Sequence, residues 1–184
     1  MTTATALGPA VEIGESVIDR ARRGDQEAFA AVIRHYDPGL RALTFRLLGD
    51  RNLMDDVLQE AYVKAFRALP RFRGDARLGT WLYRIAYNAC MDELRRSRHG
   101  RELPLDEALP SGSADPGDVA AGRGDLAQAL ATLPPDERAA VLLVDAQGFD
   151  YRESARVLGI PEGTVASRLN RARSTLRLAL ETIG

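Results

Sequence analysis

One side of the segment from residue 84 to residue 95 combines the kinds of side chain that bind unpaired nucleic acid bases. When the segment is placed on a helix at about 100° per residue, that side carries cations, an aromatic ring and an amide. The stripe consists of Arg84, Tyr87, Asn88, Met91 and Arg95. Guanidinium groups bind phosphates, rings stack on bases, and amides form hydrogen bonds with base edges. The pattern indicates contact with single-stranded DNA, although Tyr87 and the nearby Trp81 are also of types common in protein cores.

The loop before this segment contains the sequence Phe72-Arg73-Gly74-Asp75. A glycine allows the backbone to approach a ligand closely, because it has no side chain. Proteins that extrude a base from a duplex hold that base in a fitted pocket. The loop is therefore a candidate pocket for an extruded base.

Residues 150–173 have the pattern of a helix-turn-helix, in which the second helix enters the major groove of duplex DNA. Asp150 caps a short first helix, and Gly159 can adopt the left-handed conformation of a sharp turn. The polar residues expected to face outward on the second helix are Glu162, Thr164, Ser167, Arg168 and Arg171. Its arginines are suited to guanine edges or to phosphates, with Arg173 and Arg177 better placed for phosphates. The same spacing also fits a helical hairpin with a solvated arginine face, but it favours DNA binding.

The third pattern is the order of charges in residues 53–69, which are acidic near the start of one predicted helix and basic near its end. The polar residues near its start are Asp55, Asp56, Gln59 and Glu60, and those near its end are Lys64 and Arg67. Acidic groups at the start of a helix and basic groups at its end stabilise the helix dipole, which explains this order without a function. The alternative is an acidic surface that docks on another protein. Spacing alone favours the first explanation.

These candidate sites lie on a chain that is predicted to be almost entirely helical, because apolar residues recur at helical spacing in both halves. The predicted helices cover residues 16–23, 26–36, 38–49, 53–69, 78–97, 126–133, 134–148, 151–158 and 162–180. The break near residue 37 rests on Asp37-Pro38, a capping residue followed by proline at the first helical position. Residues 98–123 contain three prolines and four glycines, and they predict a flexible linker.

The expected fold class is therefore all-α, with two small helical domains joined by that linker. Residues 14–97 form the first domain, a helical bundle, and residues 124–184 form the second, which contains the helix-turn-helix. Residues 1–13 precede the first pattern and are expected to be disordered.

The net charge of −1 combines four blocks of alternating sign. Residues 1–61 carry −3, residues 62–101 carry +7, residues 102–162 carry −8 and residues 163–184 carry +3. Both basic blocks coincide with candidate DNA-binding segments. The small net charge therefore does not exclude a nucleic acid partner.

Several other classes of function are disfavoured by composition. Cys90 is the only cysteine, and His35 and His99 are the only histidines, so the sequence has neither a disulfide framework nor zinc-site spacing. No run approaches the roughly 18 apolar residues of a membrane helix, and the N-terminus has no secretory signal, so we expect a cytoplasmic protein without membrane contact of its own. A Gly-rich phosphate loop and a paired-carboxylate pocket are also absent, so we expect no enzyme, cofactor, metal or small-molecule substrate.

Taken together, the motifs resemble the sigma-70 family of bacterial RNA polymerase sigma factors, in its extracytoplasmic-function (ECF, group 4) subfamily. The first half matches at residues 55–61 (DDVLQEA), 72–75 (FRGD), 80–82 (TWL), and at Asn88, Asp92, Leu94, Arg95 and Arg96. The second half matches at residues 133–134 (LP), 163–165 (GTV), 167–169 (SRL) and 171–173 (RAR). The resemblance implies a region 2 domain in the first half and a region 4 domain in the second.

In that family, region 2 docks on the β′ clamp helices of core polymerase and melts the −10 promoter element, while region 4 binds the β flap and the −35 duplex. The positions implied for polymerase binding are Asp55, Asp56, Gln59 and Glu60 in region 2, and Leu142 and Leu143, beside Val144, in region 4. Those implied for −10 DNA are Phe72, Arg73, Gly74, Asp75, Trp81, Arg84, Tyr87, Asn88 and Arg95. Those implied for −35 DNA are Thr164, Ser167, Arg168, Arg171 and Arg173.

The resemblance also implies an anti-sigma factor as a partner and a linker that threads toward the polymerase active-site channel. The linker's acidic residues, Asp106, Glu107, Asp115 and Asp118, would mimic nucleic acid there. The alternative function is a helix-turn-helix transcription regulator that dimerises and binds palindromic duplex DNA without polymerase. That alternative gives no purpose to residues 55–60 or to the stripe on residues 84–95.

Overall fold

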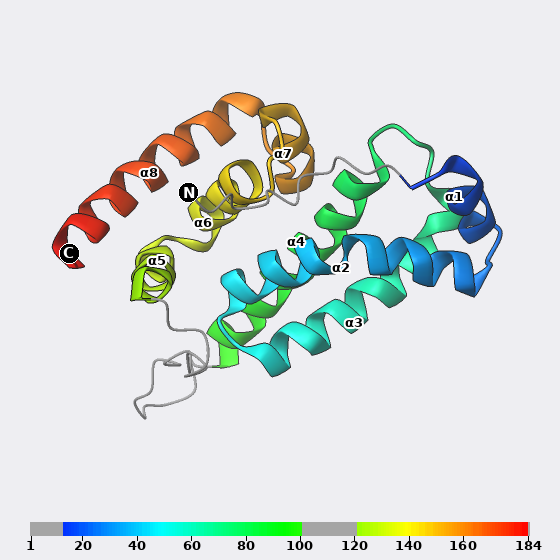
Figure 1. The fold of residues 1–184 in the computed structure, drawn as a ribbon, viewed down its shortest axis with the longest axis horizontal. Helices are drawn as coiled ribbons and strands as arrows, with labels where there is room; N and C mark the ends of the chain where they lie inside the picture. Colours follow the sequence, from blue (N-terminus) through cyan, green and yellow to red (C-terminus); the bar gives the residue numbers. More distant parts are fainter. Residues whose placement is uncertain (1–12, 101–120, 184) are drawn as a thin grey trace.

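Within residues 13–100 and 121–183, which the computed structural model describes, every regular element is a helix (Figure 1). The first half contains α1 (Glu15–Arg22), α2 (Gln26–Leu48), α3 (Arg51–Ala68), a 3-10 turn (Leu69–Arg71) and α4 (Leu78–Gly100). The second half contains α5 (Ala121–Thr132), α6 (Pro135–Val141), a π-helical turn (Leu142–Ala146), α7 (Tyr151–Leu158) and α8 (Glu162–Ile183). The predicted all-α fold class is confirmed. The expectations for residues 1–13 and for the acidic linker fall almost entirely outside the described residues.

Local sequence signals define several helix ends. The Asp25 carboxylate caps α2 by accepting a hydrogen bond from the Ala28 backbone N–H at 3.0 Å. Asp50 caps α3 in the same way through the Leu53 N–H at 2.9 Å. Between these helices Gly49 ends α2 with a φ of 75°, the left-handed conformation that glycine adopts without a steric penalty.

The predicted helix break at Asp37-Pro38 is wrong, because α2 continues through both residues. Instead of capping a new helix, the Asp37 carboxylate accepts a hydrogen bond from the Tyr62 hydroxyl of α3 at 2.7 Å. A proline inside a helix removes one backbone hydrogen bond. Here the loss is offset by packing on both sides of the proline, where Val32 and Leu40 are buried.

The core of the first half lies between α2, α3 and α4. Its buried side chains include Leu40 and Leu43 of α2, Leu58 of α3 and Cys90 of α4. Helix α1 packs against α2 at the end of this bundle, around a second cluster against which Trp81 packs. The bundle fixes which faces of α3 and α4 remain available to a partner.

The second half forms the predicted helix-turn-helix from α7 and α8. The Asp150 carboxylate accepts a hydrogen bond from the Glu153 backbone N–H at 2.7 Å, and the Glu153 carboxylate accepts one from the Asp150 N–H at 3.4 Å. This reciprocal capping box fixes the start of α7. Gly159 makes the turn with a φ of 68°, as predicted. Val165 and Leu169 of α8 are buried beneath α7 and α6.

The two halves pack directly on each other and share one hydrophobic core. Helix α4 contacts α7, and α2 contacts α5 and α6, so the second half covers one side of the first-half bundle (Figure 1). The sequence predicted two domains but gave no indication of this contact. Its consequence is that side chains from both candidate DNA-binding segments meet at the junction.

Candidate nucleic-acid and polymerase interfaces

The residues of the stripe predicted on α4 differ in exposure, because some face solvent and one lies at the junction between the two halves. Arg84, Asn88 and Arg95 are exposed. Tyr87, in contrast, is only 6% exposed and lies against the second half. Burial raises the pKa of the Tyr87 hydroxyl to about 12, and Asp136 and Arg168 are its charged neighbours. The ring that would stack on a base is therefore covered in this arrangement.

The loop between the 3-10 turn and α4 holds one aromatic pair and an exposed turn. The rings of Phe72 and Trp81 lie 5.2 Å apart at an interplanar angle of 45°, and both are half-buried. Arg73, Gly74 and Asp75 are exposed, and Gly74 has a φ of 76°. The structure thus places a cation and an open backbone turn beside a ring pair, the parts that an extruded base would need.

The acidic face of α3 lies on the surface, away from the domain junction. Asp56, Gln59 and Glu60 are exposed, and Asp55 is half-buried. The Asp55 carboxylate accepts a hydrogen bond from the Arg41 guanidinium at 2.6 Å. Asp55 is therefore oriented by α2, while Asp56 and Gln59 project from α3 toward solvent.

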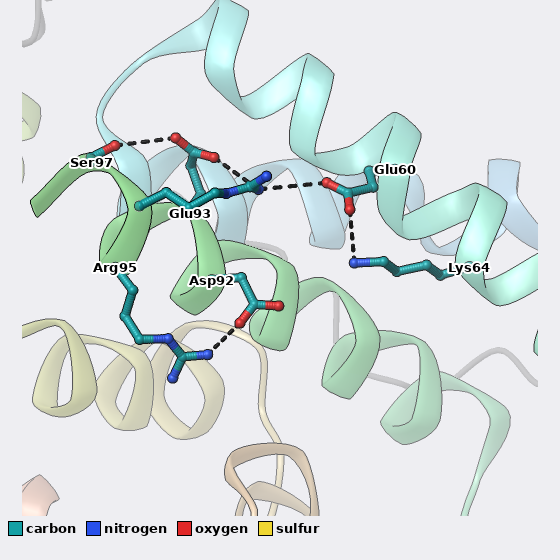
Figure 2. Close-up of polar contacts among 7 residues, drawn as sticks. Glu60, Lys64, Asp92, Glu93, Arg95 and Ser97 are labelled. Atoms are coloured by element: carbon teal, nitrogen blue, oxygen red, sulfur yellow. Dashed lines mark hydrogen bonds and ion pairs between the residues drawn. The ribbon is translucent and has the colours of Figure 1, made fainter. Parts of the chain in front are cut away.

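Glu60 belongs to a network that joins α3 to the end of α4 (Figure 2). Its carboxylate lies 2.9 Å from Lys64 Nζ and 3.6 Å from an Arg96 nitrogen. Lys64 is the main reason that the pKa of Glu60 is lowered, so the group is ionised at neutral pH. Arg96 also pairs with Glu93 at 2.9 Å, and Arg95 pairs with Asp92 on the opposite side of the helix. Helix α3 begins at Arg51 and has no acidic residue in its first turn, so the helix dipole does not explain the acidic residues of this face. Some carboxylates of the face are paired and others are exposed.

The three arginines predicted to bind −35 DNA lie on α8, and each pairs with an acidic residue of the second half. Arg168 lies 3.0 Å from Asp136 and its side chain is only 18% exposed. Arg171 donates its Nε–H to Glu137 at 2.7 Å. Arg173 donates to both oxygens of Asp145, from Nε at 3.1 Å and from Nη2 at 2.6 Å.

The outward face of α8 includes a residue that the sequence analysis missed. Gly163, Ser167, Asn170 and Ser174 are all exposed and recur every three or four residues, and the exposed Arg171 adjoins them. Thr164 is half-buried, and its backbone carbonyl accepts a hydrogen bond from the Ser167 hydroxyl at 2.9 Å. Helical spacing from Ser167 would have identified Asn170, whose amide can donate to and accept from base edges.

Three comparisons with known proteins identify the family of this chain. The model of sigma-70 region 2 matches residues 32–100, and that of sigma-70 region 4 matches residues 123–176. The ECF RNA polymerase sigma factor SigM of Mycobacterium tuberculosis is 39% identical over 83% of this chain and 77% of its own length. The RNA polymerase sigma-H factor of Pseudomonas aeruginosa is 34% identical over 94% of this chain and 96% of its own.

The chain belongs to the ECF group of the sigma-70 family. It is an alternative sigma factor, a DNA-binding subunit that directs transcription initiation by RNA polymerase. Its fold also matches the sigma factor RpoE of Bartonella quintana in complex with the anti-sigma factor NepR. That match has a TM-score of 0.70 and 29% identity over 83% of this chain and 96% of the other. CnrH in complex with the cytosolic domain of CnrY matches with a TM-score of 0.71 and 25% identity over 92% and 97% of the two chains.

In this sigma factor the structure does not expose Leu142 and Leu143, whose polymerase-binding role stays a prediction. Both side chains are buried in the core, because the π-helical turn that follows α6 directs them inward. In this arrangement the two leucines cannot form an exposed docking surface. The adjacent Val144 differs from them, because it is half-buried. The large exposed apolar side chains of region 4 include Leu126 of α5 and Leu180 of α8 instead.

The junction between regions 2 and 4 of this sigma factor is held by buried polar contacts. The Tyr83 hydroxyl of α4 donates a hydrogen bond to the Gln147 side-chain oxygen at 2.7 Å, and both residues are buried. A side chain at Gly39 of α2 would overlap the Tyr83 hydroxyl, so the glycine makes room for this contact. At the other side, Arg138 of α6 donates to the carbonyls of Arg46 and Leu47 at the end of α2, at 3.3 Å each.

The described part of this sigma factor contains no group of three or more acidic, histidine or cysteine side chains arranged to hold a metal ion. Within the same residues, no helix has both the length and the apolar character needed to span a membrane.

Proposed function

We propose that this sigma factor docks on core RNA polymerase through the exposed acidic face of α3, which we define as Asp55, Asp56, Gln59 and Glu60. Two of these carboxylates are already oriented, Asp55 by Arg41 and Glu60 by Lys64 and Arg96. Preorganised carboxylates favour a basic partner surface because less side-chain freedom is lost on binding. The observation that carries the proposal is that this face is exposed while Tyr87 and Arg168 are covered.

We further propose that promoter contacts form after regions 2 and 4 separate. Arg84, Asn88 and Arg95 of α4 then act with Tyr87 and the loop at residues 72–75 on the melted −10 element. Separation is needed because Tyr87 is a stacking platform only when region 4 no longer covers it. Region 4 reads the −35 duplex through the N-terminal half of α8.

Binding to polymerase supplies the free energy for this separation in the proposed scheme. We call the described structure, in which regions 2 and 4 pack together, the closed arrangement. It limits DNA binding by the free protein, because Tyr87 of region 2 and Arg168 of region 4 lie next to each other. The proposed partners are therefore core polymerase, promoter DNA and an anti-sigma factor, in the cytoplasm. An anti-sigma factor is included because the RpoE relative was solved with one. The chain itself acts as a binding subunit and not as an enzyme.

The docking proposal is tested by reversing one charge on the α3 face. Asp56→Arg places a cation where a basic partner is expected, and like charges across an interface are strongly unfavourable. We expect at least about a tenfold loss of affinity for core polymerase in a competition assay, with an unchanged circular dichroism spectrum. Asp19→Arg makes the same charge change on exposed α1 and serves as the control. Equal affinities for the two variants would refute docking through α3.

A further inference from the structure

The three paired arginines of α8 differ in which part of the guanidinium is occupied. Arg168 is engaged through Nη2 and largely covered, and Arg173 is engaged through both Nε and Nη2. Arg171 is held by Glu137 through Nε, and its side chain remains 60% exposed. In that contact the donor is Nε and not either of the two terminal Nη groups of Arg171. They form the edge of the guanidinium that can bind a guanine or a phosphate with two hydrogen bonds.

Glu137 lies on a helix that is held in place by its neighbours. It lies in the first turn of α6, and its side chain is only 15% exposed. The next residue, Arg138, fixes α6 by donating to the carbonyls of Ala131 at 2.8 Å and Leu133 at 3.0 Å, in addition to its contacts with α2. The Glu137 carboxylate is therefore held against α8 by a rigid element. Arg171 is likewise fixed at its backbone, because Leu169 and Ala172 on either side are fully buried.

A simpler role for Glu137 is stabilisation of the α6 dipole, since it is an acidic residue in the first turn of a helix. Asp136 is adjacent in the same turn and meets that need as well. Dipole stabilisation does not require a carboxylate that is mostly covered and 2.7 Å from an arginine of another helix. The arginine partner in this ion pair is 60% exposed, so the pair contributes little to stability. The geometry therefore points to a role in directing Arg171.

We propose that Glu137 is a positioning residue that orients Arg171 for one base pair of the −35 duplex, an inference that rests on the proposed reading of that duplex by α8. The carboxylate has two opposite effects on DNA binding. It repels phosphates, which weakens binding to any sequence. It also holds the arginine in one orientation, which strengthens binding to the cognate base pair only. Removal of Glu137 should therefore lower the ratio of specific to non-specific affinity.

The test uses the full chain assembled with core polymerase and a library of duplexes randomised across the −35 element. For Glu137→Ala we expect discrimination at one base pair to fall about fivefold to tenfold, while binding to non-specific duplex is unchanged or stronger. Glu137→Gln should fall between the wild type and Glu137→Ala, because its amide oxygen can still accept from Arg171 Nε. In an Arg171→Ala background, Glu137→Ala should cause no further loss at that base pair. Asp145→Ala removes the carboxylate that pairs with Arg173 and is the matched control, with discrimination retained at that base pair.

Three outcomes would overturn the inference. Equal strengthening of specific and non-specific binding would show that Glu137 acts by charge repulsion alone. Parallel weakening of both, with a lower melting temperature, would show a structural role. Unchanged discrimination would show no role in recognition. A wild-type holoenzyme with no −35 preference would instead refute the proposed function, so the two failures are distinguishable.

Discussion

Removal of one hydroxyl at the junction should shift the balance between the closed and open arrangements of regions 2 and 4. Tyr83→Phe keeps the ring that packs edge-on against Phe149 at 4.8 Å, and it removes only the donor to Gln147. In the closed arrangement the Gln147 oxygen would remain buried without that donor. Such a loss costs about 1–3 kcal/mol. In the open arrangement water replaces the donor, so the cost falls on the closed arrangement alone.

This cost corresponds to a shift of roughly fivefold to 150-fold toward the open arrangement. Single-molecule energy transfer between dyes on Asn52→Cys and Arg177→Cys would report it, because both positions are exposed and lie in different regions. The native Cys90 is buried and should not take up dye in the folded protein. We expect Tyr83→Phe to increase the low-transfer population and the affinity of the free protein for single-stranded −10 DNA.

The matched control is Tyr62→Phe, which removes a hydroxyl that donates to Asp37 within region 2. It should leave the distribution of transfer efficiencies unchanged. The reasoning would be refuted if Tyr83→Phe and Tyr62→Phe gave the same distribution as the wild type. It would also be refuted if the open population increased without any gain in binding to single-stranded DNA.

Three further predictions concern stability, reactivity and promoter opening. Asp150→Ala removes the capping box of α7 and should lower the free energy of unfolding by about 1 kcal/mol in urea titration, whereas an unchanged value would show that the cap contributes nothing. Burial raises the pKa of the Cys90 thiol to about 11, so at pH 8 the folded protein should react with a thiol reagent at least about a hundredfold more slowly than the unfolded chain. The folded-state rate should rise with pH, and rapid labelling of native protein at pH 8 would contradict this burial. Arg84→Ala should reduce initiation from duplex promoters more than from templates premelted at −10, and equal losses on both templates would argue against a role in opening.

Local chemistry made much of the fold predictable. The helix-turn-helix could be derived because Asp150 and Gly159 act on their immediate neighbours, through a cap and a left-handed turn. The same logic failed at Asp37-Pro38, where packing of α2 against its neighbours outweighs a local break signal. The burial of Leu142 and Leu143 was not predictable, because an apolar run does not reveal which side of a turn is covered.

The candidate sites were predictable by residue type but not by exposure. The pattern placed Tyr87 and Arg168 on outward-facing stripes, yet it gave no indication that Tyr87 is buried and Arg168 largely covered. That burial depends on contacts between segments about 50 to 80 residues apart, such as Tyr83 with Gln147 and Arg77 with Glu153. Helical periodicity carries no information about such distant contacts. The pairing of Glu137 with Arg171 was hidden from the sequence for the same reason.

Run-off transcription with purified core polymerase and a promoter library tests the central claim most directly. The wild-type chain should stimulate initiation at promoters that share a −35 duplex sequence and a −10 sequence at fixed spacing. Asp56→Arg should abolish this stimulation, while Asp19→Arg should retain it. No stimulated initiation at any promoter, with a folded wild-type chain and active core polymerase, would contradict the account.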